Sequence, residues 1–181
     1  MSPRRLLDRL RSERGFTLVE MVTVMAIMGV VMSGLTTVFV SASNNEVDMN
    51  NRFQAQSNAR LALDKFRREV HCASSVTLNS TSSVTVVLPA GCRNAGTVTW
   101  CTQGSGSRYG LYRVGGSSCS GGTKWIDYLT QANVFGYTAA AAGSRLLPKV
   151  NVDFPVNVKP SKTNELYELK DDVVLRNGTR A

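Results

Sequence analysis

The stretch that decides the fold is RGFTLVE at residues 14–20, followed by the apolar run MVTVMAIMGVVMSGLTTVFV at residues 21–40. The run contains no charged side chain over twenty residues. A helix of that length measures about 30 Å, which matches the hydrocarbon thickness of a bilayer. Residues 16–40 therefore predict a helix that spans a membrane.

The flank before this run is basic, and this predicts the direction of insertion. Five arginines stand against Asp8 and Glu13 in residues 1–15, and Lys or Arg does not recur until Arg52. Basic residues favour the cytoplasmic side of a membrane. We therefore expect a single pass through the cytoplasmic (inner) membrane, with the N-terminus inside and the remainder of the chain exported.

The formal net charge of +8 is unevenly placed and says little about partners. Residues 1–15 carry +3 of this charge, and the remaining +5 is spread over residues 16–181. A concentrated basic patch would be typical of a nucleic-acid-binding protein. DNA is thus a possible partner that the sequence does not support.

A helical pattern continues beyond the apolar run, over residues 41–72. Its buried-type residues recur at steps of four, three and four: Ala59, Leu63, Phe66 and Val70. Charged side chains fall on the other faces, which is typical of an amphipathic helix packed against a core. Because no proline interrupts residues 16–88, we expect one long helix from Phe16 to about His71.

The composition then changes to Ser, Thr, Val and Gly, which favours strands and turns over residues 73–181. Strands are expected at residues 74–78, 83–88, 97–101, 110–114, 125–129, 133–137, 150–158, 165–169 and 172–176. The first two form a hairpin, and the next two flank a Gly/Ser loop at 104–107. Pro155 indicates an edge strand, because proline lacks a backbone N–H. The fold class is therefore α+β, with the long helix (transmembrane, then amphipathic) packed on an antiparallel β-sheet.

Four cysteines lie beyond the apolar run: Cys72, Cys92, Cys101 and Cys119. An even number in an exported domain indicates two disulfides and an oxidising compartment. Three pairings are open, and we favour Cys72–Cys92 with Cys101–Cys119 because each closes a short loop. The irregular spacing and a single histidine argue against a zinc site.

The sequence offers no residues on which to base catalysis. His71 adjoins Cys72, but sequence neighbours at a helix end point in different directions and no third group is evident. The glycines at 104, 106 and 110 do not have the spacing of a nucleotide-binding loop. We therefore expect no enzyme activity, no cofactor and no metal.

Glu20 is the unusual residue of the N-terminal stretch. A carboxylate inside a membrane helix costs about 2.5–3.5 kcal/mol on insertion scales, so it requires a partner. No Lys or Arg follows before Arg52, but a free amine at Phe16 can pair with it. That amine exists only after cleavage behind Gly15, where the missing side chain leaves the backbone accessible to a protease.

The N-terminal stretch resembles the type III signal of prepilins. It contains, in this order, a basic leader, Gly15, FTL at residues 16–18, Glu20 and an apolar run. The resemblance implies a pilin-like fold, removal of the leader (residues 1–15) by prepilin peptidase, and N-methylation of Phe16. It implies that Glu20 binds the amine of an adjacent subunit, and that the apolar helix leaves the lipid to form the core of an extracytoplasmic filament. The implied partners are prepilin peptidase, other pilins or pseudopilins, the inner-membrane assembly machinery and, before assembly, membrane lipid.

The resemblance extends more weakly downstream. Three further stretches resemble minor pilins of the PilW type and minor pseudopilins of the PulJ type: RLALDKFRREV at residues 60–70, LPKV at 147–150 and VLRN at 174–177. The chain lacks the proline in the apolar helix and the C-terminal disulfide loop of many major pilins. The resemblance thus implies a minor pilin of a type IV pilus, a structural or assembly-initiating subunit. The alternative within this class is a minor pseudopilin of type II secretion.

A further alternative, from another class, is an ordinary secretory signal. The sequence Val40-Ser41-Ala42 offers small residues to signal peptidase, which would release a secreted binding domain near Ala42. This reading leaves Glu20 without a role, and the apolar run is longer than a usual signal-peptide core. The N-terminus of the mature protein distinguishes the two classes.

Overall fold

The computed structural model describes residues 16–140, 146–162 and 165–177, and the chain divides into two compact units, Met1–Asp48 and Met49–Ala181. Its main elements are α2 (Leu18–Cys72), β1 (Ser75–Ser80), β2 (Ser83–Leu88), β3 (Gly96–Ser105), β4 (Arg108–Gly115), β5 (Thr123–Leu129), β6 (Phe135–Thr138), β7 (Lys149–Val156) and β8 (Tyr167–Val174). Helix α2 is continuous and contributes to both units, so the expected long helix is confirmed.

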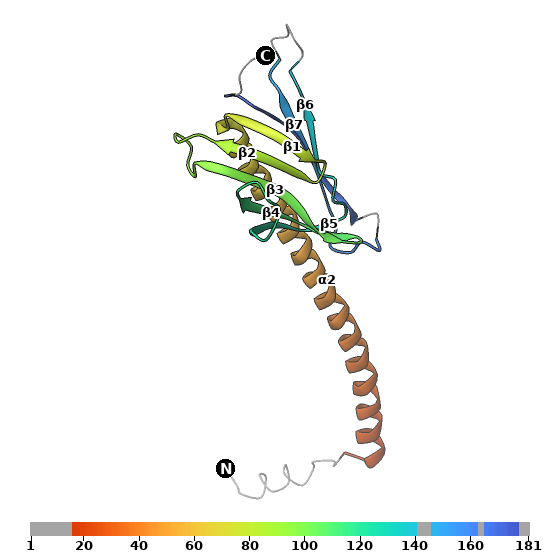
Figure 1. The fold of residues 1–181 in the computed structure, drawn as a ribbon. Coiled ribbons are helices and arrows are strands. Elements are labelled where there is room, and N and C mark those ends of the chain that lie inside the picture. Colours follow the sequence, from red (N-terminus) through yellow and green to blue (C-terminus); the bar gives the residue numbers. More distant parts are fainter. Residues whose placement is uncertain (1–15, 141–145, 163–164, 178–181) are drawn as a thin grey trace, which may run out of the picture. The chain divides into compact units, whose positions relative to one another are not determined.

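The second unit is a curled antiparallel sheet against which the C-terminal part of α2 packs (Figure 1). Its strand order is β1-β2-β3-β4-β5-β7-β6, and β8 pairs with β7. The sheet curls back on itself, because the carbonyl of Thr81 in the β1–β2 turn accepts the N–H groups of Val134 and Phe135 next to β6. The α+β class predicted from the sequence is confirmed.

The predicted strands are found with shifted ends: several are longer, two are joined, and the one expected at 150–158 ends at Val156 as β7. The hairpin of β1 and β2 is confirmed. The strands expected at 97–101 and 110–114 extend into β3 and β4 through the Gly/Ser loop and leave a turn at residues 106–107. Gly104 permits this, because it adopts a φ of 145° where any Cβ would collide with the backbone of Arg108. The strands expected at residues 165–169 and 172–176 are joined in the single strand β8, which runs only from Tyr167 to Val174.

The edge position predicted for Pro155 is wrong, because β7 is paired on both sides. On the side facing β6 and β5, the N–H of Asp153 donates to Val134 O at 2.9 Å. Two positions beyond the proline, the N–H of Asn157 donates to Tyr128 O at 2.9 Å. Pro155 lies between these bonds, where β6 has ended and β5 has just begun to pair. The missing N–H therefore leaves no break in the ladder, and an interior strand accepts the proline.

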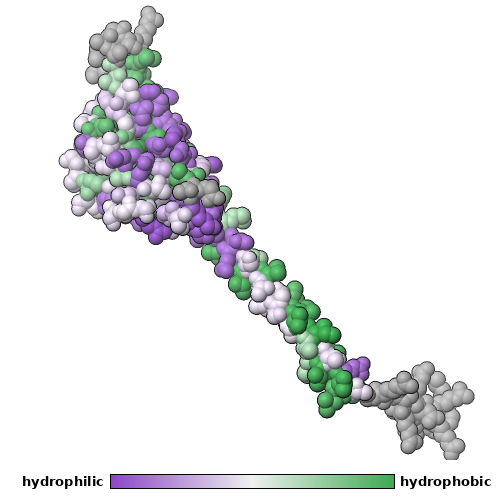
Figure 2. Space-filling view, turned by 90° about the vertical axis from the view of Figure 1, so that its right-hand side faces the viewer, coloured by the Kyte–Doolittle hydropathy of each residue, from purple (hydrophilic) through white to green (hydrophobic). Residues whose placement is uncertain are grey.

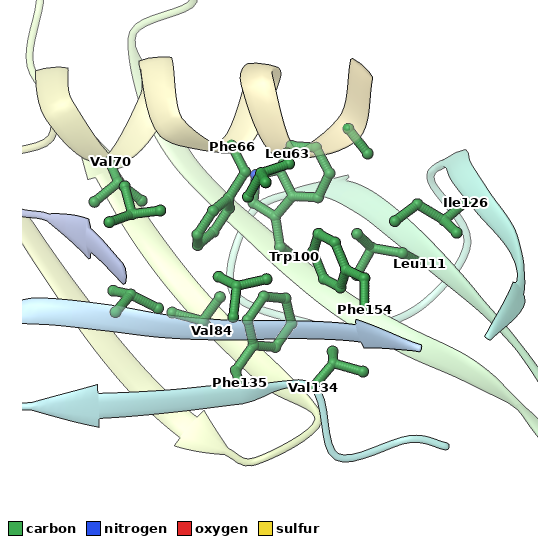
Figure 3. Packing of buried hydrophobic residues seen from close by; sticks show 14 of the residues in the cluster. Leu63, Phe66, Val70, Val84, Trp100, Leu111, Ile126, Val134, Phe135 and Phe154 are labelled. Carbon is green, nitrogen blue, oxygen red and sulfur yellow. The ribbon is translucent and has the colours of Figure 1, made fainter. Parts of the chain in front are cut away.

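The core of the second unit lies between α2 and the sheet (Figure 3). The predicted stripe of the helix is confirmed, since Leu63, Phe66 and Val70 point into this core and are buried. Phe66 meets Trp100 edge to face with ring centroids 5.7 Å apart, a favourable geometry for aromatic pairs. Burial of this apolar face, rather than helix propensity, fixes the C-terminal part of α2 on the sheet.

Side chains of α2 also cover the outer edge of β8. Arg67 Nε donates to Asp171 Oδ2 at 2.7 Å, a hydrogen bond that raises the pKa of the Arg67 guanidinium. His71 Nδ1 donates to the carbonyl oxygen of Val174 at 2.9 Å. An uncovered edge strand is a template for unwanted pairing with another chain. The long polar side chains of the helix thus occupy an edge that would otherwise be open.

Two disulfides connect the loops of the sheet. Cys72 at the end of α2 is bonded to Cys92 in the β2–β3 loop, and Cys101 of β3 is bonded to Cys119 in the β4–β5 loop. These are the pairs favoured from the sequence. With sequence separations of 20 and 18, each stabilises the folded unit by about 3 kcal/mol in the chain-entropy account.

Candidate functional site

The candidate site is the start of α2 and the apolar run that follows it. The helix begins at Leu18, and Thr17 is its N-cap residue, because Thr17 Oγ1 accepts the backbone N–H of Glu20 at 3.3 Å. Thr17 and Glu20 thus occupy the first and last positions of a T-x-x-E capping box. The sequence contains this signal, but the capping role of these residues was not predicted from it.

Glu20 lies in the first turn of α2, where a negative charge is favoured by the positive end of the helix dipole. It is exposed, and among residues 16–140, 146–162 and 165–177 no basic side chain forms an ion pair with its carboxylate. Phe16 precedes the helix and is 76% exposed. Gly15, the predicted residue before the cleaved bond, lies outside the described residues.

The helix surface after Glu20 is apolar and uncovered. Figure 2 shows hydrophobic side chains over much of the visible face of the N-terminal unit. The exposed large residues of this segment are Met21, Val22, Val24, Met25, Ile27, Met28, Val30, Val31, Met32, Leu35, Val38, Phe39 and Val40. By length and composition α2 contains one candidate membrane span, and none of its most apolar window is buried by this chain. Such a surface requires lipid or other protein to cover it.

The hydroxyl groups in this segment are compatible with an apolar environment. Thr23 Oγ1 donates to Glu20 O at 2.9 Å, and Ser33 Oγ donates to Val30 O at 2.8 Å. Thr36 and Thr37 form the same kind of bond with carbonyls four and three residues earlier. Because each hydroxyl is satisfied within its own helix, lipid or a packed helix can cover it at little cost.

A buried carboxylate in the second unit, Glu69, was not predicted from the sequence. Glu69 is only 5% exposed, and its Oε2 accepts Trp100 Nε1 at 2.8 Å. Its Oε1 accepts Arg113 Nε at 2.9 Å and lies 3.1 Å from Lys65 Nζ. Helical spacing could have revealed it, because Glu69 lies on the apolar face between Phe66 and the end of the helix. The group fastens α2 to β3 and β4 rather than forming a reactive site.

We predict that Glu69→Gln destabilises the second unit by about 2 kcal/mol. The glutamine amide is uncharged, so it loses the ion pairs with Arg113 and Lys65. Its NH2 group is also a hydrogen-bond donor and would face side chains that are themselves donors. Chemical unfolding of the full chain in detergent, followed by tryptophan fluorescence, measures the loss. Glu168→Gln is the control, because Glu168 forms only an exposed pair with Lys170. Equal midpoints for the two variants would contradict the role assigned to Glu69.

The residues considered for other chemistry have structural partners. His71 contacts the edge carbonyl of β8, and its neighbour Cys72 is held in a disulfide. Within the described residues, no group of three or more His, Cys, Asp or Glu side chains is placed to hold a metal ion. The largest exposed apolar surface in the described part of the chain is the N-terminal half of α2.

Comparison with known proteins addresses this same segment. A family model described as the prokaryotic N-terminal methylation motif matches residues 10–36. No curated protein and no solved structure matches the chain. The matched residues contain Gly15, Phe16 and Glu20, together with most of the apolar run.

The motif supports a type IV pilin-like or pseudopilin-like protein. It suggests a structural subunit rather than an enzyme, and it implies processing by prepilin peptidase and assembly with other pilins. The motif and the exposed apolar helix also fit a protein that is first anchored in a membrane and then carried in a filament.

Proposed function

We propose that this chain is a minor pilin of a type IV pilus, a structural or assembly-initiating subunit. The observation that carries the proposal is an uncovered apolar helix placed directly after a methylation motif. The apolar helix alone is not sufficient, since a secretory signal sequence can have the same length and composition. Together the two features indicate a helix that is first covered by lipid and later by the helices of neighbouring subunits.

The proposed order of events begins at the membrane. The leader, residues 1–15, stays in the cytoplasm, residues 16–40 span the inner membrane, and the β-rich domain (residues 73–181) folds outside with its two disulfides. Prepilin peptidase cuts between Gly15 and Phe16, and the new amine of Phe16 is methylated.

Glu20 is proposed to bind the methylated amine of Phe16 in an adjacent subunit. The Glu20 carboxylate is exposed and has no basic partner among the described residues, so it is available for this contact. Inside packed helices the pair is little screened by water. A subunit shifted along the filament would bury one of these charges unpaired, and the pair therefore fixes the axial register.

The disulfides favour a minor subunit. They close loops at residues 72–92 and 101–119, so no disulfide encloses the C-terminal part of the chain as in many major pilins. The apolar helix also lacks a proline. The inner-membrane assembly machinery and other pilins are the proposed partners. A minor pseudopilin of type II secretion shares these features and is distinguished by the filament that contains the chain.

The test is mass spectrometry of the mature N-terminus of the protein recovered from the envelope and from sheared pili. We expect N-methylated Phe16, with the chain present in the pilus fraction at a small fraction of the major subunit. A start at Met1, or near Ser43 after cleavage at Ala42, would overturn the proposal. Presence in the envelope only, together with loss of protein secretion on deletion, would identify a pseudopilin instead.

A further inference from the structure

A hollow of about 320 Å³ lies at the C-terminal end of α2, within the second unit. We call it the basic hollow, and the residues that matter here are Lys65, Arg68, Leu88, Arg93 and the disulfide Cys72–Cys92. Its volume is at the lower end of the range for small-molecule sites. The disulfide and Leu88 supply apolar lining, and the three basic side chains supply positive charge.

The two arginines of the basic hollow are not neutralised by the protein, whereas Lys65 is paired with Glu69. Arg68 and Arg93 are exposed, and in the described part of the chain neither has an acidic side chain as an ion-pair partner. Arg68 Nε donates to the backbone carbonyl of Asp64 at 3.2 Å, which anchors the base of its guanidinium. The terminal nitrogens of both arginines are therefore the groups to consider for a ligand.

The one carboxylate in the hollow does not oppose an anion. Glu69 accepts bonds on both oxygens, from Trp100 on one and from Arg113 and Lys65 on the other. One negative charge thus faces two positive charges, and the surplus remains positive even without the arginines of the rim. An approaching anion meets attraction rather than repulsion at this end of the helix.

We propose that the basic hollow binds an oxyanion, a carboxylate or phosphate group carried on a small molecule or chain end. A guanidinium presents paired N–H donors that match the oxygens of both groups, and such charge-assisted bonds are stronger than neutral ones. The apolar lining accommodates the body to which the oxyanion is attached. The three basic residues come from the helix and from the β2–β3 loop, and the Cys72–Cys92 disulfide holds these two segments together.

The experiment uses the full chain in a nonionic detergent at constant ionic strength, titrated with inorganic phosphate and separately with N-acetylleucine. Amide NMR signals of Arg93 and Asn94 report on the hollow directly. We expect these signals to shift saturably with at least one probe. The variants Arg68→Gln and Arg93→Gln should each weaken binding about tenfold. Both residues are exposed, so neither change should disturb folding.

Arg108→Gln is the matched control, because it removes the same charge from an exposed arginine at the start of β4, opposite the far end of β3. Gly96 of β3 pairs with Leu88 in the hollow, whereas Ser105 pairs with Arg108, about 30 Å along the strand. This variant should bind like the unmodified chain. Binding of phosphate alone or of N-acetylleucine alone identifies the oxyanion. Absence of a saturable shift with both probes, or equal weakening by Arg108→Gln, would overturn the proposal.

Discussion

A precursor with Gly15→Leu is expected to remain uncleaved. The substitution places a branched side chain on the acyl side of the bond that prepilin peptidase is proposed to cut, where glycine leaves the backbone accessible. Processing should fall from essentially complete to undetectable, and the chain should keep the fifteen leader residues. Immunoblotting of cells that express the peptidase, with mass spectrometry of the N-terminus, measures the effect.

Gly29→Leu is the control for this variant. It is the same change fourteen positions along the chain, in a helical segment where a Cβ would meet no atom within 4 Å apart from the local helix backbone and the neighbouring residues. This precursor should be cleaved normally. If Gly15→Leu were also cleaved normally, the proposed site of processing would be excluded, together with the proposed origin of the Phe16 amine.

The second large effect is expected for Glu20, where the structure separates two possible roles. Glu20 is the last residue of a T-x-x-E capping sequence that begins at Thr17, and a carboxylate at this position can stabilise the start of a helix without any neighbouring subunit. It is also the proposed partner of the Phe16 amine. Glutamine preserves the capping box but removes the charge, whereas valine removes both.

We expect both Glu20→Val and Glu20→Gln to be cleaved and then to fail in assembly. Burying the methylated amine without its counter-charge costs about 3–5 kcal/mol, equivalent to a reduction in incorporation of about a hundredfold or more. The amount of the chain in sheared pili, relative to the amount in the membrane, measures incorporation. Full incorporation of Glu20→Gln beside a defect in Glu20→Val would assign Glu20 to helix capping and overturn the pairing.

Glu46→Val is the matched control for the loss of charge. Glu46 is an exposed carboxylate of the same helix, beyond the apolar run. Its removal should leave incorporation unchanged. A defect equal to that of Glu20→Val would indicate that the total charge of the helix, rather than a specific pair, governs assembly.

The segment from the start of the apolar run to the end of α2 could be predicted, because the signals in it depend only on residues close together in sequence. An uncharged run of twenty residues, a basic flank and one carboxylate at a fixed position are all visible along the chain. The amphipathic stripe at Leu63, Phe66 and Val70 was equally accessible, because helical periodicity alone selects the face that is buried.

The tertiary structure decided the features that depend on partners distant in sequence. In the sequence, Glu69 is not distinguished from the exposed charged residues of the helix. In the fold, β3 and β4 place Trp100 and Arg113 beside its carboxylate. From the sequence, Pro155 indicated an edge strand. Only the fold shows that β6 ends before this proline and that β5 begins to pair after it, so an interior strand can accept it. The basic hollow likewise depends on the fold, because its lining comes from the end of α2 and from the β2–β3 loop, about twenty residues further along the chain.

The sequence by itself thus determined the long helix, its apolar half and the methylation motif at its start, since each rests on periodicity or on neighbours within a few residues. Only the tertiary structure decided the order of the strands, the position of the proline strand and the environments of the buried and rim charges. These depend on which segments meet across the sheet, and contacts between distant segments leave no period in the sequence.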